Sequence, residues 1–169
     1  MNRIDRRRWA ILGFAAGLAA APAFAAPPLD AASARAFVQS VYAHYKGADA
    51  LNWQPMSEGS APGLFEPSLV KLIATTAASG SEDEVGPLDF DPLCACQDPQ
   101  GLQASVVVDK VEGETAKAVA VVRFPDAPQD QPRTIRYDLV VVKGQWRIAD
   151  LHEDDLPSLR ALLAAPPKP

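Results

Sequence analysis

Two cysteines separated by one residue are the part of this sequence most able to do chemistry. Cys94 and Cys96 flank Ala95, and side chains at i and i+2 of an extended segment point to the same side. Three states are open: a disulfide that closes a very small, strained ring, a thiolate pair that binds a soft metal ion, or two separate thiols that are buried or paired between chains. A metal site would need further ligands, for which His44 and His152 are the candidates.

Three aspartates surround the cysteine pair: Asp89, Asp91 and Asp98. Paired carboxylates can act as general acid and base or bind a cation. However, Asp before Pro and Asp after Gln are typical of turns, because the carboxylate accepts hydrogen bonds from nearby backbone N–H groups. We therefore interpret these aspartates as residues that shape a loop, with Gln97 anchoring it in the interior. Asp91, Gln97 and Asp98 remain candidates for binding a ligand or partner, together with Trp53.

An alternative acid–base site would use Asp138 as its base. Burial in an apolar pocket raises the pKa of an Asp toward the range in which it works as a general base. The phenols that could act as donors are those of Tyr42, Tyr45 and Tyr137. Thr134 and Arg136 share the strand face of Asp138, which indicates a solvated face with Tyr137 on the opposite one. Asp138 and Tyr42 are therefore only weak candidates for a catalytic pair, in an alternative hypothesis that the protein is an enzyme.

The two histidines fall in different surroundings. His44 follows an apolar helical stripe and is interpreted as a helix-surface residue. His152 lies in the acidic run 150–155, which favours its charged form, and we interpret it as part of a solvated turn.

Helices are predicted in the first half of the chain. Asp30 is a natural N-cap for a helix over 31–46, whose apolar residues recur at helical spacing. A loop with at most one short turn is expected over 47–63. A second helix over 67–78 follows, with Pro67 in its first turn.

Strands are predicted in the second half, at 104–109, 117–124, 134–142 and 146–151. Val-rich segments with period two alternate there with turns at Gly113 and Lys143-Gly144. A short last helix is expected from 155 to 163. The order predicts an α+β fold in which N-terminal helices pack on a curved, four-stranded antiparallel sheet with a short C-terminal helix.

The N-terminal residues 1–25 are interpreted as a secretory signal peptide. Arg3, Arg6, Arg7 and Arg8 precede an apolar run, and Ala23-Phe24-Ala25 forms a small-x-small cleavage pattern. We expect cleavage after Ala25 and export to the periplasm or beyond, by the Sec route rather than the twin-arginine route. The remainder divides into a linker over 26–30, one α+β domain over 31–163 and a tail over 164–169.

Composition narrows the class of protein. The 169 residues, 48% of them apolar, suffice for one globular domain. The net charge of −5 argues against a nucleic-acid binder, which needs a basic face. We expect no cofactor, because the sequence has no Gly-rich phosphate loop, and no membrane association once the leader is removed.

Three segments resemble a bacterial exported family known as domain of unknown function 3828. They are residues 37–45 (FVQSVYAHY), 89–98 (DFDPLCACQD) and 144–150 (GQWRIAD). The resemblance implies the cone-shaped fold of nuclear transport factor 2-like, or cystatin-like, proteins. Family members share Asp-Pro and Gln-Asp around a variable stretch, and both cysteines lie in that stretch here. The family has no agreed activity, so the resemblance implies fold and compartment rather than mechanism.

The sequence thus predicts an exported, soluble, non-enzymatic domain that binds a small ligand or another exported protein through the Asp91–Asp98 loop. The alternatives are a cone-fold enzyme that uses Asp138 with a Tyr, and a redox or metal-handling module built on Cys94 and Cys96.

Overall fold

The structure is a computed structural model that describes residues 28–47, 50–79, 88–127 and 131–165. The predicted leader, residues 1–25, lies outside these ranges, as do residues 26–27 of the linker and 166–169 of the tail. No helix within these ranges is both long and apolar enough to cross a membrane.

Helix α1 (Ala31–Ala43) begins at the predicted cap. Oδ1 of Asp30 accepts a hydrogen bond from the Ser33 N–H at 2.8 Å, and Oγ of Ser33 accepts one from the Asp30 N–H at 3.0 Å. The helix ends three residues earlier than predicted, because the following N–H groups bond to carbonyls three residues back instead of four. Tyr45, in this tightened turn, is still buried.

Three further helices, one of them not predicted, complete the helical part of the fold. Helix α3 (Pro67–Ser79) starts at Pro67 as predicted. The segment predicted as a loop contains a 3₁₀ turn (Ala50–Asn52) and ends in the short helix α2 (Ala61–Leu64). Helix α4 (Leu159–Ala164) begins later than the predicted 155, because Ser158 provides its cap by accepting the Ala161 N–H at 2.9 Å.

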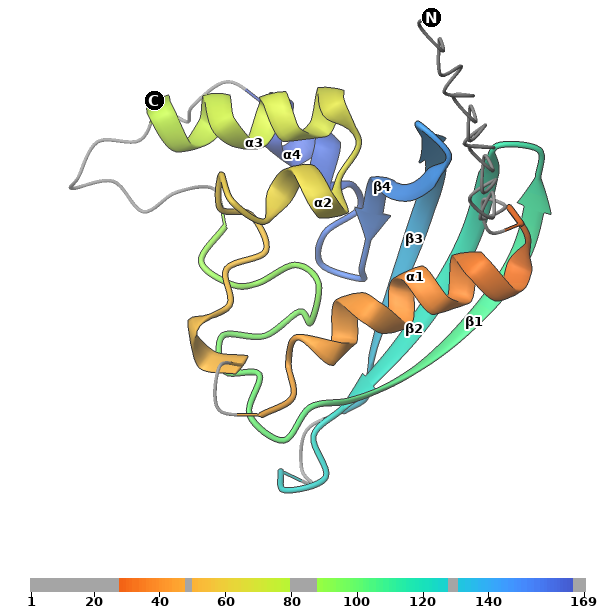
Figure 1. The fold of residues 1–169 in the computed structure, drawn as a ribbon. Helices are drawn as coiled ribbons and strands as arrows, with labels where there is room; N and C mark the ends of the chain where they lie inside the picture. Colours follow the sequence, from red (N-terminus) through yellow and green to blue (C-terminus); the bar gives the residue numbers. More distant parts are fainter. Residues whose placement is uncertain (1–27, 48–49, 80–87, 128–130, 166–169) are drawn as a thin grey trace, which may run out of the picture.

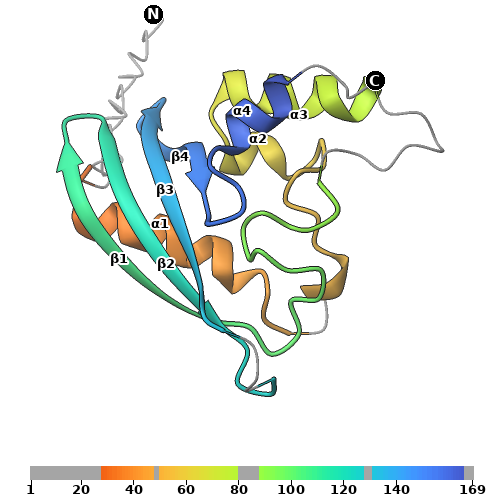
Figure 2. The ribbon, with the colours of Figure 1, turned by 180° about the vertical axis from the view of Figure 1, so that it is seen from behind.

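Four strands form one antiparallel sheet in the order β1-β2-β3-β4. They are β1 (Gln103–Glu112), β2 (Thr115–Arg123), β3 (Arg133–Val142) and β4 (Gln145–His152). The sheet curves around α1, which crosses its concave face, while α2, α3 and α4 gather beyond β4 (Figure 1). Viewed from behind, β1, β2 and β3 lie in front of α1 (Figure 2). The predicted α+β class is therefore confirmed.

The strand faces are those that the period-two pattern predicts. Ile135, Tyr137 and Leu139 of β3 are buried, whereas Asp138 points to the other face of the sheet. Lys143 and Gly144 both adopt positive φ (52° and 75°), which gives the β3–β4 hairpin a turn whose twist suits the strands. Trp146 packs against α1, and its Nε1 donates to Oγ of Ser33 at 3.0 Å.

Candidate functional site

The segment 88–102 is a loop that contains a disulfide between two cysteines separated by one residue. Cys94 and Cys96 are bonded to each other, and their residues are 0% and 5% exposed. Ala95 between them has a φ of +52°, and the Asp91 N–H donates to the Cys96 carbonyl at 2.8 Å. The structure thus holds the first of the three cysteine states that the sequence left open. In this state neither sulfur is a thiolate that could bind a metal ion.

Asp91 ties this loop to helix α1. Its Oδ2 accepts the Tyr45 hydroxyl at 2.6 Å, and its Oδ1 accepts the Leu93 N–H at 2.9 Å. Burial raises the pKa of Asp91 above its usual range, although both hydrogen bonds act in the opposite direction. Asp91 therefore shapes the turn and anchors it, which fits the turn interpretation.

Two buried tyrosine hydroxyls form hydrogen bonds to the carbonyl of Leu93 in the loop. The Tyr42 hydroxyl donates to the Leu93 carbonyl at 2.9 Å and lies 2.7 Å from the Tyr137 hydroxyl. Burial raises the pKa of both phenols well above the usual range, so both stay protonated. Neither phenol lines any of the pockets described below, and Tyr42 thus joins α1, β3 and the loop. The Tyr137 hydroxyl lies 3.3 Å from the same Leu93 carbonyl. The sequence gave no sign that both hydroxyls would meet at this carbonyl.

Two other loop residues differ in their roles. Oδ1 of Asp98 accepts the Gln100 N–H at 2.9 Å, which is the expected turn bond. The prediction that Gln97 anchors the loop in the interior is wrong: its side chain is exposed and donates to the Asp89 carbonyl at 3.3 Å. Gln97 bridges two parts of the loop at its surface, because the disulfide and Asp91 occupy the interior side.

Asp138 lies on the outer face of the sheet, away from Tyr42. It pairs with Lys117 Nζ at 2.6 Å and with His152 Nε2 at 3.3 Å, and its side chain is 31% exposed. The structure therefore does not bring the two catalytic candidates of the enzyme hypothesis together.

His152 is the last residue of β4 and is half-buried, so the prediction that it belongs to a solvated turn is wrong. Burial alone would lower the pKa of His152, but its contacts with the Pro157 carbonyl and with Asp138 and Asp150 outweigh burial and raise it. His44 stacks on Trp53, with ring centroids 4.5 Å apart and an interplanar angle of 10°. Within the described ranges, no three His, Cys, Asp or Glu side chains are grouped so that they could hold a metal ion.

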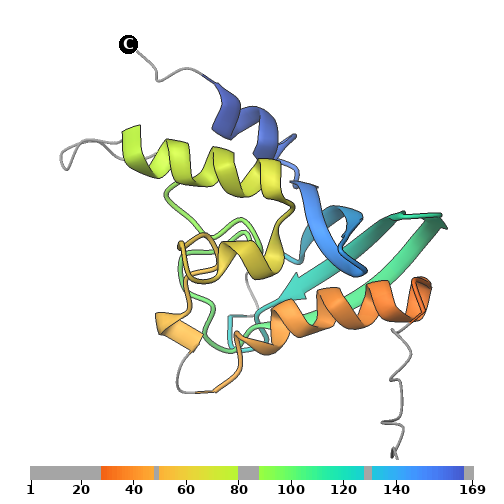
Figure 3. The same cartoon turned by 45° about the horizontal axis from the view of Figure 1, so that its top comes forward.

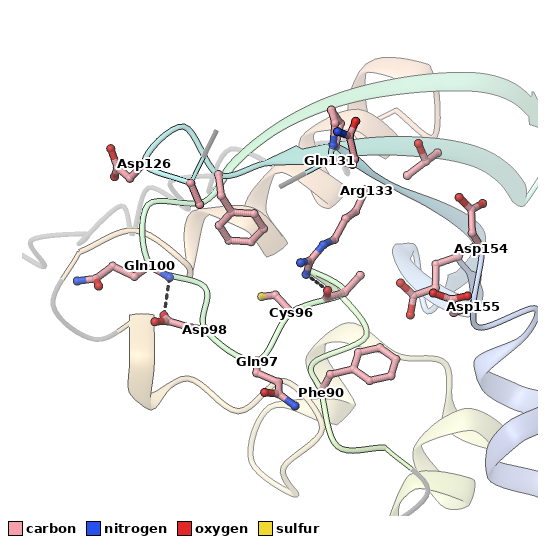
Figure 4. Close-up of a pocket in the computed structure, with 16 residues that line it drawn as sticks. Phe90, Cys96, Gln97, Asp98, Gln100, Asp126, Gln131, Arg133, Asp154 and Asp155 are labelled. Atoms are coloured by element: carbon pink, nitrogen blue, oxygen red, sulfur yellow. Dashed lines mark hydrogen bonds between the residues drawn. The ribbon is translucent and has the colours of Figure 1, made fainter. Parts of the chain in front are cut away.

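A pocket of about 990 Å³ opens beside the disulfide, at the end where β2 leaves the sheet and β3 enters it. We call it the Cys96 pocket. Its walls come from the loop, the β2–β3 connection and the residues after β4. Figure 4 shows Asp98 and Gln100 on one side, Asp154 and Asp155 on the other, and Arg133 reaching toward the loop between them.

The charges around the Cys96 pocket are unbalanced. Five carboxylates line it, against one guanidinium: Asp98, Asp126, Glu153, Asp154 and Asp155 against Arg133. Arg133 is already engaged, since its Nη1 donates to the Ala95 carbonyl and its guanidinium lies 5.4 Å from the centroid of the Phe124 ring. The pocket therefore presents net negative charge beside aromatic surface.

Glu153 is the carboxylate of the pocket whose pKa is raised by burial and by its acidic neighbours. Burial, followed by the charges of Asp155 and Asp154, raises the pKa of Glu153, and Arg133 only partly opposes them. Oε1 of Glu153 is buried and finds no hydrogen-bond donor in the described part of the chain. A buried acceptor without a donor is uncommon and requires an explanation.

Sequence reasoning missed most residues of the pocket, among them Phe124, Arg133 and Glu153. A signal existed for two of them, because Phe124 and Arg133 flank the connection between adjacent antiparallel strands and must lie near each other. No sequence pattern placed that connection beside the cysteine loop.

Comparison with known proteins adds little to this geometry. No family model matches the chain, and no curated protein matches it. Among solved structures, the intermembrane-space region of the chloroplast protein ARC6 is similar over 75% of this chain and 98% of that chain, with 17% identity and a TM-score of 0.31.

Proposed function

We propose that this protein is an exported, non-enzymatic binding domain that accepts a cationic ligand in the Cys96 pocket. The observation that carries the proposal is the buried, unpartnered Oε1 of Glu153 in a pocket wall rich in carboxylates. An ammonium or guanidinium group in the pocket would be attracted by this carboxylate and would reduce the repulsion among its neighbours. Export rests on the predicted leader and on the resemblance to the exported family.

The form of the ligand follows from the spread of the charges. The carboxylates are distributed over three wall segments and do not converge on one point among the described residues. Such a distribution suits several amines on one chain better than a single metal ion. Phe90 and Phe124 add aromatic surface, over which a cation or an apolar stem can lie. We therefore expect a Lys- or Arg-rich segment of another exported protein.

The experiment measures fluorescence anisotropy of fluorescein-labelled hexalysine and hexaglutamate with the purified protein. Hexalysine should bind saturably, its affinity should fall as salt rises, and hexaglutamate should not bind. The variant Glu153→Gln/Asp154→Asn/Asp155→Asn should bind hexalysine at least tenfold more weakly. Unlabelled spermidine, added as a competitor, distinguishes a small polyamine ligand from a peptide ligand.

The matched control is Asp109→Asn/Glu112→Gln/Glu114→Gln. It removes the same number of charges at the β1–β2 end, which is the opposite end of β2 from the pocket. If both triple variants weaken hexalysine equally, the attraction is to the net charge of the protein and the proposed pocket is wrong.

A further inference from the structure

A second hollow lies away from the Cys96 pocket, at the other end of β3. It is a groove of about 1030 Å³ between α1, the segment 59–64 that includes α2, and the β3–β4 turn. Figure 3 shows α1 running below α2 and β4, with these elements facing each other. We call it the α1 groove. Of the site residues predicted from the sequence, Trp53 and His44 line it.

The surface of the α1 groove is mainly apolar and aromatic. Leu29, Phe37, Trp53, Leu64 and Trp146 line it, and Leu29 is 37% exposed. The stacked ring of His44 extends the wall beyond Trp53. A concave, largely apolar surface with a few polar groups is the usual form of a small-molecule site.

One charged group selects the ligand. The Arg147 guanidinium lines the groove and donates to the Trp146 carbonyl at 2.7 Å, to Oε1 of Gln145 at 2.7 Å and to the Pro62 carbonyl at 3.3 Å. All three acceptors are uncharged, and no carboxylate in the described ranges forms an ion pair with Arg147. A guanidinium has five N–H donors, so two remain for a ligand, and a carboxylate is its best-matched partner.

One carboxylate, that of Asp30, also lines the groove, but no ion pair joins it to Arg147 in the described ranges. Oδ1 of Asp30 accepts the Ser33 N–H at 2.8 Å as the cap of α1. The groove therefore combines an apolar surface with a cation that lacks a charged partner, while the Cys96 pocket combines aromatic surface with excess negative charge. Arg147 is the group of the α1 groove that can pair with an anion, whereas the Cys96 pocket favours a cation, so the two sites need different ligands.

We infer that the α1 groove binds an apolar monocarboxylate, with the hydrocarbon chain along Phe37, Trp53 and Trp146 and the carboxylate on Arg147. The inference is independent of the proposed cation site, because the two sites share no lining residue.

The tryptophans give a direct readout of binding. The chain has three Trp residues, of which Trp53 and Trp146 line the groove. The experiment uses protein purified from the periplasm of expressing cells and carrying Trp9→Phe, so that any retained leader is silent. Dodecanoate, dodecylammonium and dodecanol are titrated below their micellar or solubility limits while Trp emission is recorded. Dodecanoate should shift the emission saturably and bind at least tenfold more tightly than dodecylammonium.

Variants locate the site. Arg147→Met keeps an apolar stem and should weaken dodecanoate at least tenfold, whereas Arg147→Lys should retain most of the affinity. Arg136→Met removes an exposed Arg of the outer sheet face and should change nothing. Ala36→Phe adds bulk to an exposed groove-lining position of α1 without adding a tryptophan, and it should block all three probes.

Two results would overturn the inference. Equal binding of dodecanoate and dodecylammonium would show non-selective adsorption of a hydrocarbon chain. Unchanged dodecanoate affinity in Arg147→Met, with thermal unfolding like that of the parent, would show that Arg147 does not select the ligand.

Discussion

Tyr45 and Asp91 show how one pair of side chains holds the loop. The Tyr45 hydroxyl is a donor to a carboxylate whose charge burial disfavours. Tyr45→Phe removes that donor, and we expect a loss of about 1.5–3 kcal/mol in the free energy of unfolding at neutral pH. Because the bond favours the ionised carboxylate, the loss should shrink as pH falls and Asp91 becomes protonated. Urea unfolding between pH 4 and 8 measures both effects.

Tyr42→Phe is the control for that prediction. Its hydroxyl bonds to a carbonyl and another phenol, not to a carboxylate. Tyr42→Phe should lower the free energy of unfolding by about 1 kcal/mol at every pH between about 4 and 8. A pH-independent loss in Tyr45→Phe would contradict the assigned role of the Tyr45–Asp91 bond.

His152 gives the stability a second pH dependence with a defined sign. Its folded pKa is raised above 6.5, so the folded state binds more protons than the unfolded state between 6.5 and the folded value. The stabilisation is complete below pH 6.5 and is lost as pH rises through the folded pKa. His152→Gln should remove this decline. His44→Gln should leave it unchanged, since His44 contacts Trp53 and not Asp138; a parental slope in His152→Gln would refute the assignment.

At the scale of the element, the cysteine loop depends on more than its disulfide. The Cys94–Cys96 ring is small, so the chain-entropy relation assigns it only about 1–2 kcal/mol. Bonds to Tyr42, Tyr45 and Arg133 remain without it. We expect Cys94→Ala/Cys96→Ala to fold and to lose about that amount of stability in denaturant unfolding.

Reductant supplies the control for the disulfide prediction. The chain has two cysteines, so the double variant should not respond to dithiothreitol, while the parent should fall to about the stability of the variant. Complete unfolding of the reduced parent would contradict this account, because it would make the disulfide the main support of the loop.

The secondary-structure elements were predictable, whereas their contacts were not. The helical spacing after Asp30 and the period-two pattern of residues 134–142 reflect burial on one face, so the sequence alone predicts both elements. The end of α1 and the start of α4 depended on hydrogen bonds at single residues, and both were misplaced. The predicted position of Gln97 was wrong because the disulfide and Asp91 occupy the interior side of the loop, and no local pattern indicated that they would.

The candidate site was even less accessible to sequence reasoning. Asp98 and Gln97 do line the Cys96 pocket, but Phe124, Arg133 and Glu153 join them only because the sheet brings three chain segments together. Oε1 of Glu153 lacks a donor among the residues that the structure describes, and no local sequence pattern can indicate such an absence.

At the scale of the whole molecule, two hollows lie at opposite ends of β3. The Cys96 pocket lies at the β2–β3 end with excess carboxylates, and the α1 groove lies beside α1, α2 and the β3–β4 turn with an available guanidinium. The overall charge of −5 favours approach of a cationic partner, and salt should weaken that attraction.

The most direct test of the central claim is a titration of ¹⁵N-labelled protein with hexalysine, followed by NMR. We expect saturable shifts in backbone amides that border the Cys96 pocket, over 95–100, 124–127, 131–134 and 153–155. The amide signals of residues 109–114, a segment that also contains carboxylates, should shift little. Shifts of equal size at both ends of the sheet, or none at the pocket, would contradict the claim that this pocket binds a cationic ligand.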